Sequence, residues 1–199
     1  MIAGAVCALA LASLSACEKS TPPPEPPKAE APRAPDYDLL SFGVQHVGPV
    51  EAGAALSVDS LSELVGTSVV TEETEDGPEG PRAVLRVFDG DELLYVVERD
   101  GEGHASRIRI GSPMMKGEQG VEVGTSYLGG ADSLSGLSCQ SGAGAYAKSL
   151  LCSSSEAPNI SLVFENGTGE TFSVALSPED QKNTLAGKDV LEVLWQPPG

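Results

Sequence analysis

Four cysteines carry the most distinctive chemistry in this sequence: Cys7, Cys17, Cys139 and Cys152. Cys17 closes the tetrad Leu14-Ser15-Ala16-Cys17, in which an aliphatic residue and two small residues precede a thiol. This tetrad looks like a bacterial lipobox, whose thiol takes a diacylglyceryl group and whose cleavage before the cysteine frees an α-amine for another acyl chain. Because two or more acyl chains anchor a protein stably at a membrane, we predict that Cys17 is a lipidation site.

The residues before Cys17 have the character of an export signal. Residues 2–16 are almost wholly apolar or small and contain no Asp, Glu, Lys or Arg. The run is shorter than the roughly 20 residues that span a bilayer, and it suits the apolar region of a signal peptide. We expect residues 1–16 to be removed, and Cys7 with them. A buried hydrophobic helix is the alternative, but the residues that follow could not fold back to cover it.

A proline-rich segment follows the tetrad, with seven prolines in residues 22–35. Proline lacks a backbone donor and fixes φ, so neither helix nor sheet is expected here. We interpret residues 17–36 as a lipid-anchored linker that holds a globular envelope domain, residues 37–199, away from the membrane. A PxxP ligand of another protein has the same composition. Glu18, in place of Asp, favours the outer membrane by the sorting pattern of well-studied lipoproteins.

Cys139 and Cys152 would be the cysteines left after signal removal and lipidation. In an oxidising compartment a lone pair of cysteines usually forms a disulfide. A redox pair or a metal site is the alternative, but redox pairs are usually spaced CxxC. The histidines, His46 and His104, lie far from both cysteines in the sequence. We therefore predict a structural disulfide between Cys139 and Cys152.

Charge and missing motifs exclude several classes of function. Acidic residues outnumber basic ones 29 to 12, giving a formal net charge of −17, which repels nucleic acid. The stretch GTSYLGG (124–130) does not match a nucleophile elbow, and GAGAYAKS (142–149) lacks the glycine that precedes the lysine of a phosphate loop. We expect no catalytic residue, no metal site and no cofactor, and hence a protein that is not an enzyme.

The first half of the domain has clear signals for helix and strand. Ser57 or Ser60 can cap a short helix that Gly66 ends, and Ser60 with Glu63 has the spacing of a capping box. The acidic stretch 71–81 is interpreted as a solvated loop. Strands are expected at 84–88 and 92–98, joined by an Asp89-Gly90 turn, and at 105–110.

The second half has a similar mixture of elements. Strands are expected at 121–123, 159–165, 171–176 and 190–195, with a weak helix near 132–138 and a loop bounded by the two cysteines. Ser177 and Pro178 begin another helix, because a cap is followed by proline and acids. The fold class that we predict is α+β, a largely antiparallel sheet with short helices on one face.

Three pairs of segments match in the same order along the chain. They are 59–64 with 132–137, 84–90 with 160–167, and 106–113 with 191–198. The order predicts two degenerate tandem repeats of a helix followed by a meander, at about 43–115 and 116–199.

Five stretches together resemble a family of bacterial envelope lipoproteins catalogued as domain of unknown function 1131. They are SRIRIGSP (106–113), GVEVGTSY (120–127), the pair Cys139 and Cys152, PNISLVFENG (158–167) and LSPEDQKNTLAGKDVLEVLW (176–195). The resemblance covers about residues 43–198. It implies a lipid-anchored periplasmic domain and brings no known activity.

The helix-then-meander unit is also similar, at the level of fold alone, to tandem inhibitor modules and outer-membrane assembly lipoproteins, which suggests protein binding. We expect a lipid-anchored periplasmic or outer-membrane lipoprotein that is not an enzyme and that binds another envelope protein or maintains the envelope. A periplasmic ligand-binding sensor or inhibitor module is the first alternative. An enzyme with an unrecognised site is the second.

Overall fold

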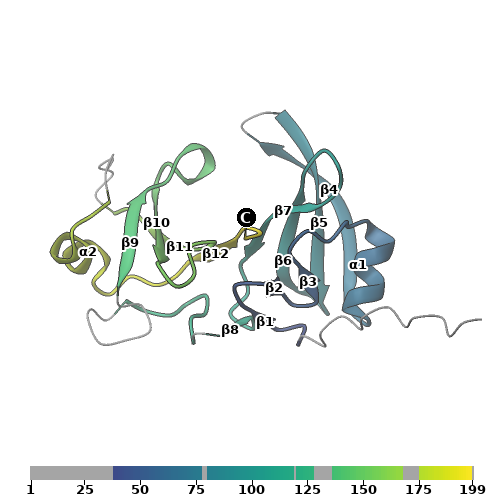
Figure 1. The fold of residues 1–199 in the computed structure, drawn as a ribbon, viewed down its shortest axis with the longest axis horizontal. Helices are drawn as coiled ribbons and strands as arrows, with labels where there is room; N and C mark the ends of the chain where they lie inside the picture. The colour runs from purple at the N-terminus through teal and green to yellow at the C-terminus, as the bar shows by residue number, and fades with distance from the viewer. Residues whose placement is uncertain (1–37, 78–79, 119, 128–135, 168–174, 199) are drawn as a thin grey trace, which may run out of the picture. The chain divides into compact units, whose positions relative to one another are not determined.

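The computed structural model describes five stretches of the chain: residues 38–77, 80–118, 120–127, 136–167 and 175–198 (Figure 1). All of them belong to the second of the two units into which the chain divides, residues 35–199. The predicted signal peptide, the predicted linker and the lipidation site Cys17 lie outside the described residues, so these interpretations stay predictions.

An antiparallel sheet of eight strands is the main element of the described residues. Its strands lie in the order β4-β5-β6-β7-β12-β11-β10-β9. The two halves of this order meet where β7 pairs with β12, with Ile110 opposite Val193 and Ile108 opposite Trp195. The bounds are β4 Val69–Gly77, β5 Gly80–Asp89, β6 Glu92–Arg99, β7 Ala105–Ile110, β9 Leu137–Ser141, β10 Ser149–Ser154, β11 Ile160–Glu165 and β12 Glu192–Trp195.

A second, smaller sheet has the order β3-β2-β1-β8. Here β1 pairs antiparallel with β2 but parallel with β8. Each strand has two residues, too few for an alternating pattern to show in the sequence. The bounds are β1 Ser41–Phe42, β2 His46–Val47, β3 Val50–Glu51 and β8 Lys116–Gly117.

Helix α1 (Val58–Val65) lies at the position that the cap signals predicted. The Ser57 hydroxyl accepts a hydrogen bond from the Ser60 N–H at 3.1 Å, and the Ser60 hydroxyl accepts one from the Ser57 N–H at 2.8 Å. The capping box therefore pairs Ser57 with Ser60, and not Ser60 with Glu63. Gly66 ends the helix with a φ of 66°, a conformation that glycine adopts without strain.

Helix α2 (Pro178–Leu185) confirms the helix start predicted at Ser177. The Ser177 hydroxyl accepts a hydrogen bond from the Asp180 N–H at 3.2 Å, and Pro178 occupies the first turn, where a missing N–H costs nothing. A short 3₁₀ helix, η1 (Gly144–Tyr146), lies between β9 and β10.

The expected α+β class is wrong, because the fold is mainly β, with two α-helices among the described residues. The acidic stretch 71–81, interpreted as a loop, lies almost wholly in the paired strands β4 and β5. The loop expected between the cysteines is the hairpin of β9 and β10, with η1 at its turn. Acidic, Gly-rich and Ser-rich composition was interpreted as loop, whereas partners elsewhere in the sheet hold these segments as strands.

The strands predicted on either side of the Asp89-Gly90 turn and at 105–110 are confirmed as β5, β6 and β7. The turn between β5 and β6 lies one residue later than expected, at Gly90-Asp91, because Asp89 still pairs with Glu92. Gly90 has a φ of 59°, which explains why a glycine stands there.

In the second half β11 and β12 confirm the strands predicted at 159–165 and 190–195. The strand expected at 121–123 is wrong, since these residues form no strand. The helix expected near 132–138 lies mostly outside the described residues, and its last residues belong to β9. Of the strand expected at 171–176, residues 171–174 lie outside the described residues.

The core gathers on one face of the large sheet. Because side chains alternate along a strand, Leu85, Val97, Ile108 and Trp195 occupy successive cross-strand positions on this face, and each is fully buried. Helix α1 and the small sheet contribute further buried side chains, including Leu61, Phe42, Val47 and Val50. The indole N–H of Trp195 donates to the Val44 carbonyl at 3.2 Å, which satisfies the polar atom of the largest core side chain.

The segments of the predicted repeat occupy both equivalent and non-equivalent places in the sheet. The third pair lies mainly in β7 and β12, the two strands that meet at the middle of the strand order. The second pair lies mainly in β5 and β11, of which β5 is second from its edge and β11 third. The first pair includes residues outside the described stretches. The tandem repeat stays a prediction.

Cys139 on β9 and Cys152 on β10 form a disulfide. The two residues face each other directly in the register of the two strands, and both are fully buried on the core face. The predicted pairing is therefore confirmed, and the bond ties an edge strand to its neighbour.

Replacement of both cysteines by alanine should lower the free energy of unfolding by about 3 kcal/mol, because the bridge restricts a loop in the unfolded chain. Urea denaturation followed by circular dichroism measures the loss. Reduction of the wild-type protein should reproduce it, and Cys139→Ala/Cys152→Ala should not respond to the reductant. Equal unfolding midpoints for oxidised wild type and the double variant would contradict a stabilising disulfide.

Candidate functional site

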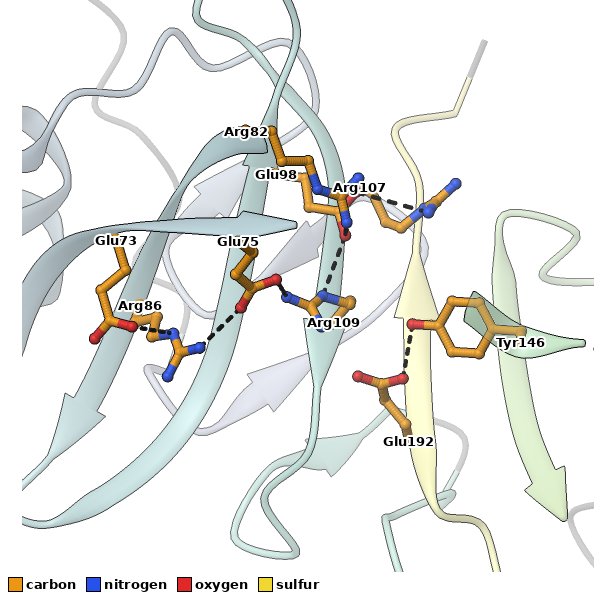
Figure 2. Close-up of polar contacts among 9 residues, drawn as sticks. All are labelled: Glu73, Glu75, Arg82, Arg86, Glu98, Arg107, Arg109, Tyr146 and Glu192. Atoms are coloured by element: carbon orange, nitrogen blue, oxygen red, sulfur yellow. Dashed lines mark hydrogen bonds and ion pairs between the residues drawn. The ribbon is translucent and has the colours of Figure 1, made fainter. Parts of the chain in front are cut away.

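A network of charged side chains covers the sheet face opposite the core, mainly over β4 to β7 (Figure 2). Four of the chain's six arginines belong to it. We call this set the charged face: Glu73 and Glu75 on β4, Arg82 and Arg86 on β5, Glu98 on β6, Arg107 and Arg109 on β7, Glu192 on β12, and Tyr146 from η1.

Strand alternation explains why these residues share one face. On β7, Ile108 and Ile110 point to the core and are fully buried, so Arg107 and Arg109 point the other way. Cross-strand pairing then sets each arginine beside a neighbour of the same face, with Arg107 opposite Glu98. The sheet register, and no local motif, assembles the charged face.

Glu98 is the central carboxylate, because its side chain is only 6% exposed and three arginines surround it. Arg82 holds it with both terminal guanidinium nitrogens, at 2.7 and 2.8 Å. The Nε of Arg109 lies 3.1 Å from Oε1, and a terminal nitrogen of Arg107 lies 3.6 Å from Oε2. A buried carboxylate is costly unless it is paired, and the planar guanidinium fork matches it in shape as well as charge.

Glu75 links Glu98 to the edge strand β4. Arg109 pairs with both Glu98 and Glu75, and Arg86 donates to Glu75 at 2.9 Å while its Nε lies 3.2 Å from Glu73. Burial by itself would raise the pKa of Glu75, but the hydrogen bonds and positive charges of Arg86 and Arg109 outweigh it and hold that pKa below its ordinary value. Glu75 is therefore a firmly ionised partner in the network.

Tyr146 and Glu192 form a second part of the charged face, near the junction of the two halves of the sheet (Figure 2). The Tyr146 hydroxyl donates to the Glu192 carboxylate at 2.8 Å. Burial raises the pKa of Glu192, although the hydrogen bond from Tyr146 and the charge of Arg109 oppose the shift. Burial and the neighbouring Glu192 charge raise the pKa of Tyr146, so the phenol keeps its proton.

This arrangement suits recognition better than proton transfer or nucleophilic attack. Glu75 and Glu98 are bound to guanidinium groups that never deprotonate, so they are poor general bases. In the stretches that the structure describes, no three His, Cys, Asp or Glu side chains gather as a metal site. The face presents three arginines, Arg82, Arg86 and Arg109, held by ion pairs, and a tyrosine held by its hydrogen bond to Glu192.

The histidines that the sequence singled out have structural contacts. His46 is buried, with Nδ1 3.1 Å from the Gly48 carbonyl and Nε2 3.1 Å from the Glu118 carboxylate. His104 lies beside Asp100, whose carboxylate accepts the His104 backbone N–H at 2.9 Å. The disulfide cysteines lie on the core face, so none of these residues joins the charged face.

The sequence did not suggest the charged face, although it held a signal for it. Arg107 and Arg109 flank Ile108, and Arg82 and Arg86 are four residues apart around a strand core, so each pair shares a face of its strand. Which carboxylates meet them depends on the register of β4 and β6, which a single sequence does not reveal. Tyr146 lies in GAGAYAKS (142–149), the stretch that lacks the glycine a phosphate loop needs before its lysine.

Comparison with known proteins places the chain in a family. The model of the family described as "Protein of unknown function (DUF1131)" matches residues 39–197, and the chain belongs to this family. The fold is similar to that in the crystal structure of the uncharacterized protein yfeY from Escherichia coli, with a TM-score of 0.57 and 19% sequence identity over 78% of this chain and 99% of that one. The comparison with curated proteins found no significant match.

The resemblance to the family with domain of unknown function 1131 is thereby confirmed. Its placement in the bacterial envelope belongs with the proposed function below. Within the described residues, neither α-helix is long and apolar enough to cross a membrane.

We expect Glu98→Gln to lower the free energy of unfolding by about 3 kcal/mol, because it leaves Arg82, Arg107 and Arg109 without their common buried partner. Chemical denaturation of the variant and of wild type measures the loss. Glu73→Gln is the matched control, since the Glu73 side chain is 47% exposed and its ion pair should contribute less than about 1 kcal/mol. Similar losses for the two variants would show that Glu98 is not the centre of the network.

Glu192→Gln tests the raised pKa of Glu192 while keeping an acceptor for Tyr146. A carboxyl with a raised pKa in the folded state binds more protons folded than unfolded between its two pKa values, so its contribution to stability falls as pH rises through that interval. The stability of the variant relative to wild type should therefore increase from about pH 4.5 to neutral pH. Denaturation midpoints across this range measure it, with Glu63→Gln on α1 as an exposed control. A difference that does not vary with pH would contradict the shift.

Proposed function

We propose that this protein is a lipid-anchored component of the bacterial envelope that binds another envelope protein through its charged face and catalyses no reaction. Its tether is Cys17 in the tetrad LSAC, after the apolar run 2–16 and before the proline-rich linker. Glu18 directs it to the outer membrane, facing the periplasm. The disulfide between Cys139 and Cys152 supports export, because such bonds persist in oxidising compartments.

The charged face is the observation that carries the binding role. Arginine and tyrosine are enriched at the centres of protein interfaces, where they supply large contact areas and directed hydrogen bonds. The ion pairs around Glu98 and Glu75 already fix Arg82, Arg86 and Arg109, so less side-chain freedom is lost when a partner docks. A fixed pattern of opposite charges also selects for a complementary partner and rejects others.

The contrast between these arginines and the acidic character of the whole chain supports the same role. The protein carries a formal net charge of −17, yet most of its arginines lie on this one face. The face is therefore electrostatically distinct from an otherwise acidic protein. A partner with a matching charge pattern would find one preferred orientation here.

In-cell photocrosslinking of the anchored protein tests the proposal. A photoreactive residue at Glu73, at the rim of the charged face, should capture a specific envelope protein. The same residue at Glu63, on the exposed side of α1, is the matched control and should not capture it. Identical crosslinking from both positions, or none from either, would contradict binding through the charged face.

The tether has its own readout in the same cells. Acyl labelling should mark the wild-type protein and fail on Cys17→Ser, and the variant should also lose most of the Glu73 crosslink, because it is no longer held at the membrane. Equal acyl incorporation in both proteins would contradict Cys17 as the anchor while leaving the crosslinking result to stand by itself.

A further inference from the structure

An open cavity of about 550 Å³ adjoins the charged face at the ends of strands β4 to β7. Its lining includes three arginines, Arg82, Arg99 and Arg107, together with Glu98 and Ser106. Cavities of this size are typical of small-molecule sites, although most such sites have a more apolar lining than this one.

Arg107 makes the fewest polar side-chain contacts of the three arginines that line this cavity. Its one ion pair is the 3.6 Å approach to Glu98, longer than a hydrogen bond, and its side chain makes no hydrogen bond within the described residues. Its Nε is buried without a hydrogen-bond partner, and its side chain is 35% exposed. Figure 2 shows Arg107 reaching Glu98 with one nitrogen while the rest of the guanidinium points away from the network.

The neighbouring arginines differ from Arg107 in how they are held. Arg82 is bound to both oxygens of Glu98, but its Nε is also buried without a hydrogen-bond partner. Arg99 pairs with Glu72 and donates to the Leu56 carbonyl at 3.2 Å, and its Nε too is buried without a hydrogen-bond partner. The Nε atoms of Arg86 and Arg109, outside the cavity, also lack a hydrogen bond but lie 3.2 and 3.1 Å from carboxylate oxygens. An unsatisfied buried N–H is costly, so three such groups beside one cavity indicate that an acceptor is missing there.

The charged groups around the cavity indicate that the missing acceptor is an anion. Three guanidinium groups line the cavity, and two carboxylates, Glu98 and Glu72, pair with them, which leaves one positive charge. In the rest of the network Arg86 and Arg109 face Glu73, Glu75 and Glu192, so the surplus positive charge is local to the cavity. A single anionic group in the cavity would neutralise the surplus and accept hydrogen bonds from Arg107.

We infer that this cavity binds a small molecule through an oxyanion, a carboxylate or a phosphate, with Arg107 as the main contact and Arg82 beside it. The guanidinium fork binds both groups in bidentate fashion. A small ligand fits better than an acidic macromolecule, because a protein with a net charge of −17 repels a large polyanion. The inference goes beyond the proposed function, since it requires neither the tether nor a protein partner.

Titration of the full chain carrying Cys17→Ser, in neutral detergent, with inorganic phosphate and with succinate tests this site. Sodium chloride keeps the ionic strength constant throughout. The arginine Nε–H signals in ¹H–¹⁵N spectra report on the two contacts directly. We expect saturable shifts of the Arg107 and Arg82 signals with at least one probe, and the tighter probe identifies the oxyanion that the cavity prefers.

Arg107→Gln should weaken binding of that probe at least about tenfold, and Arg107→Lys should weaken it less, because lysine keeps the charge but loses the fork. Lys182→Gln is the charge-matched control on the exposed surface of α2 and should bind as wild type. Shifts that never saturate, or equal affinity of Arg107→Gln and wild type, would overturn the inference. Neither outcome would alter the Glu73 crosslink, so the two proposals fail separately.

Discussion

The buried carboxylate of Glu98 is the constraint on which the charged face depends. A carboxylate with 6% of its side chain exposed must be paired, and neighbouring strands supply Arg82, Arg107 and Arg109 for that purpose. Arg109 then needs a second carboxylate, which Glu75 on β4 provides. One buried charge thus determines the partners on β5 and β7 and, through Arg109, reaches the edge strand β4.

This dependence explains where prediction from the sequence succeeded. Strands β5, β6 and β7 are apolar segments bounded by turn residues, and α1 and α2 carry their own cap residues, so local signals were enough. Strand β4 reads as a solvated acidic loop because its carboxylates have no local partner. Glu75 meets Arg109 only through a contact 34 residues distant in the chain, which no local pattern records. The predicted fold class was wrong because strands of this kind have a composition that is typical of loops.

The sequence likewise predicted only part of the functional residues. The disulfide could be predicted because it needs only a count of cysteines and a compartment. The charged face could not, because each of its members is an ordinary strand or loop residue taken singly. Tyr146 and Glu192, which are 46 residues apart, meet only because β11 pairs with both β10 and β12, so that η1, between β9 and β10, can reach β12. A site built by register stays hidden until the register is known.

The position of β4 gives its carboxylates a second role. As an edge of the eight-stranded sheet it presents backbone groups that could pair with another chain, and charged side chains on an edge strand discourage such pairing. Glu73 and Glu75 can serve in this way and still bind arginine, because they lie on one face while Glu72 lies on the other with Arg99. An acidic edge strand is stable here because arginines on β5, β6 and β7 neutralise it from both faces. The same pairs leave the charged face ordered before any partner arrives, which is the condition for specific rather than merely electrostatic binding.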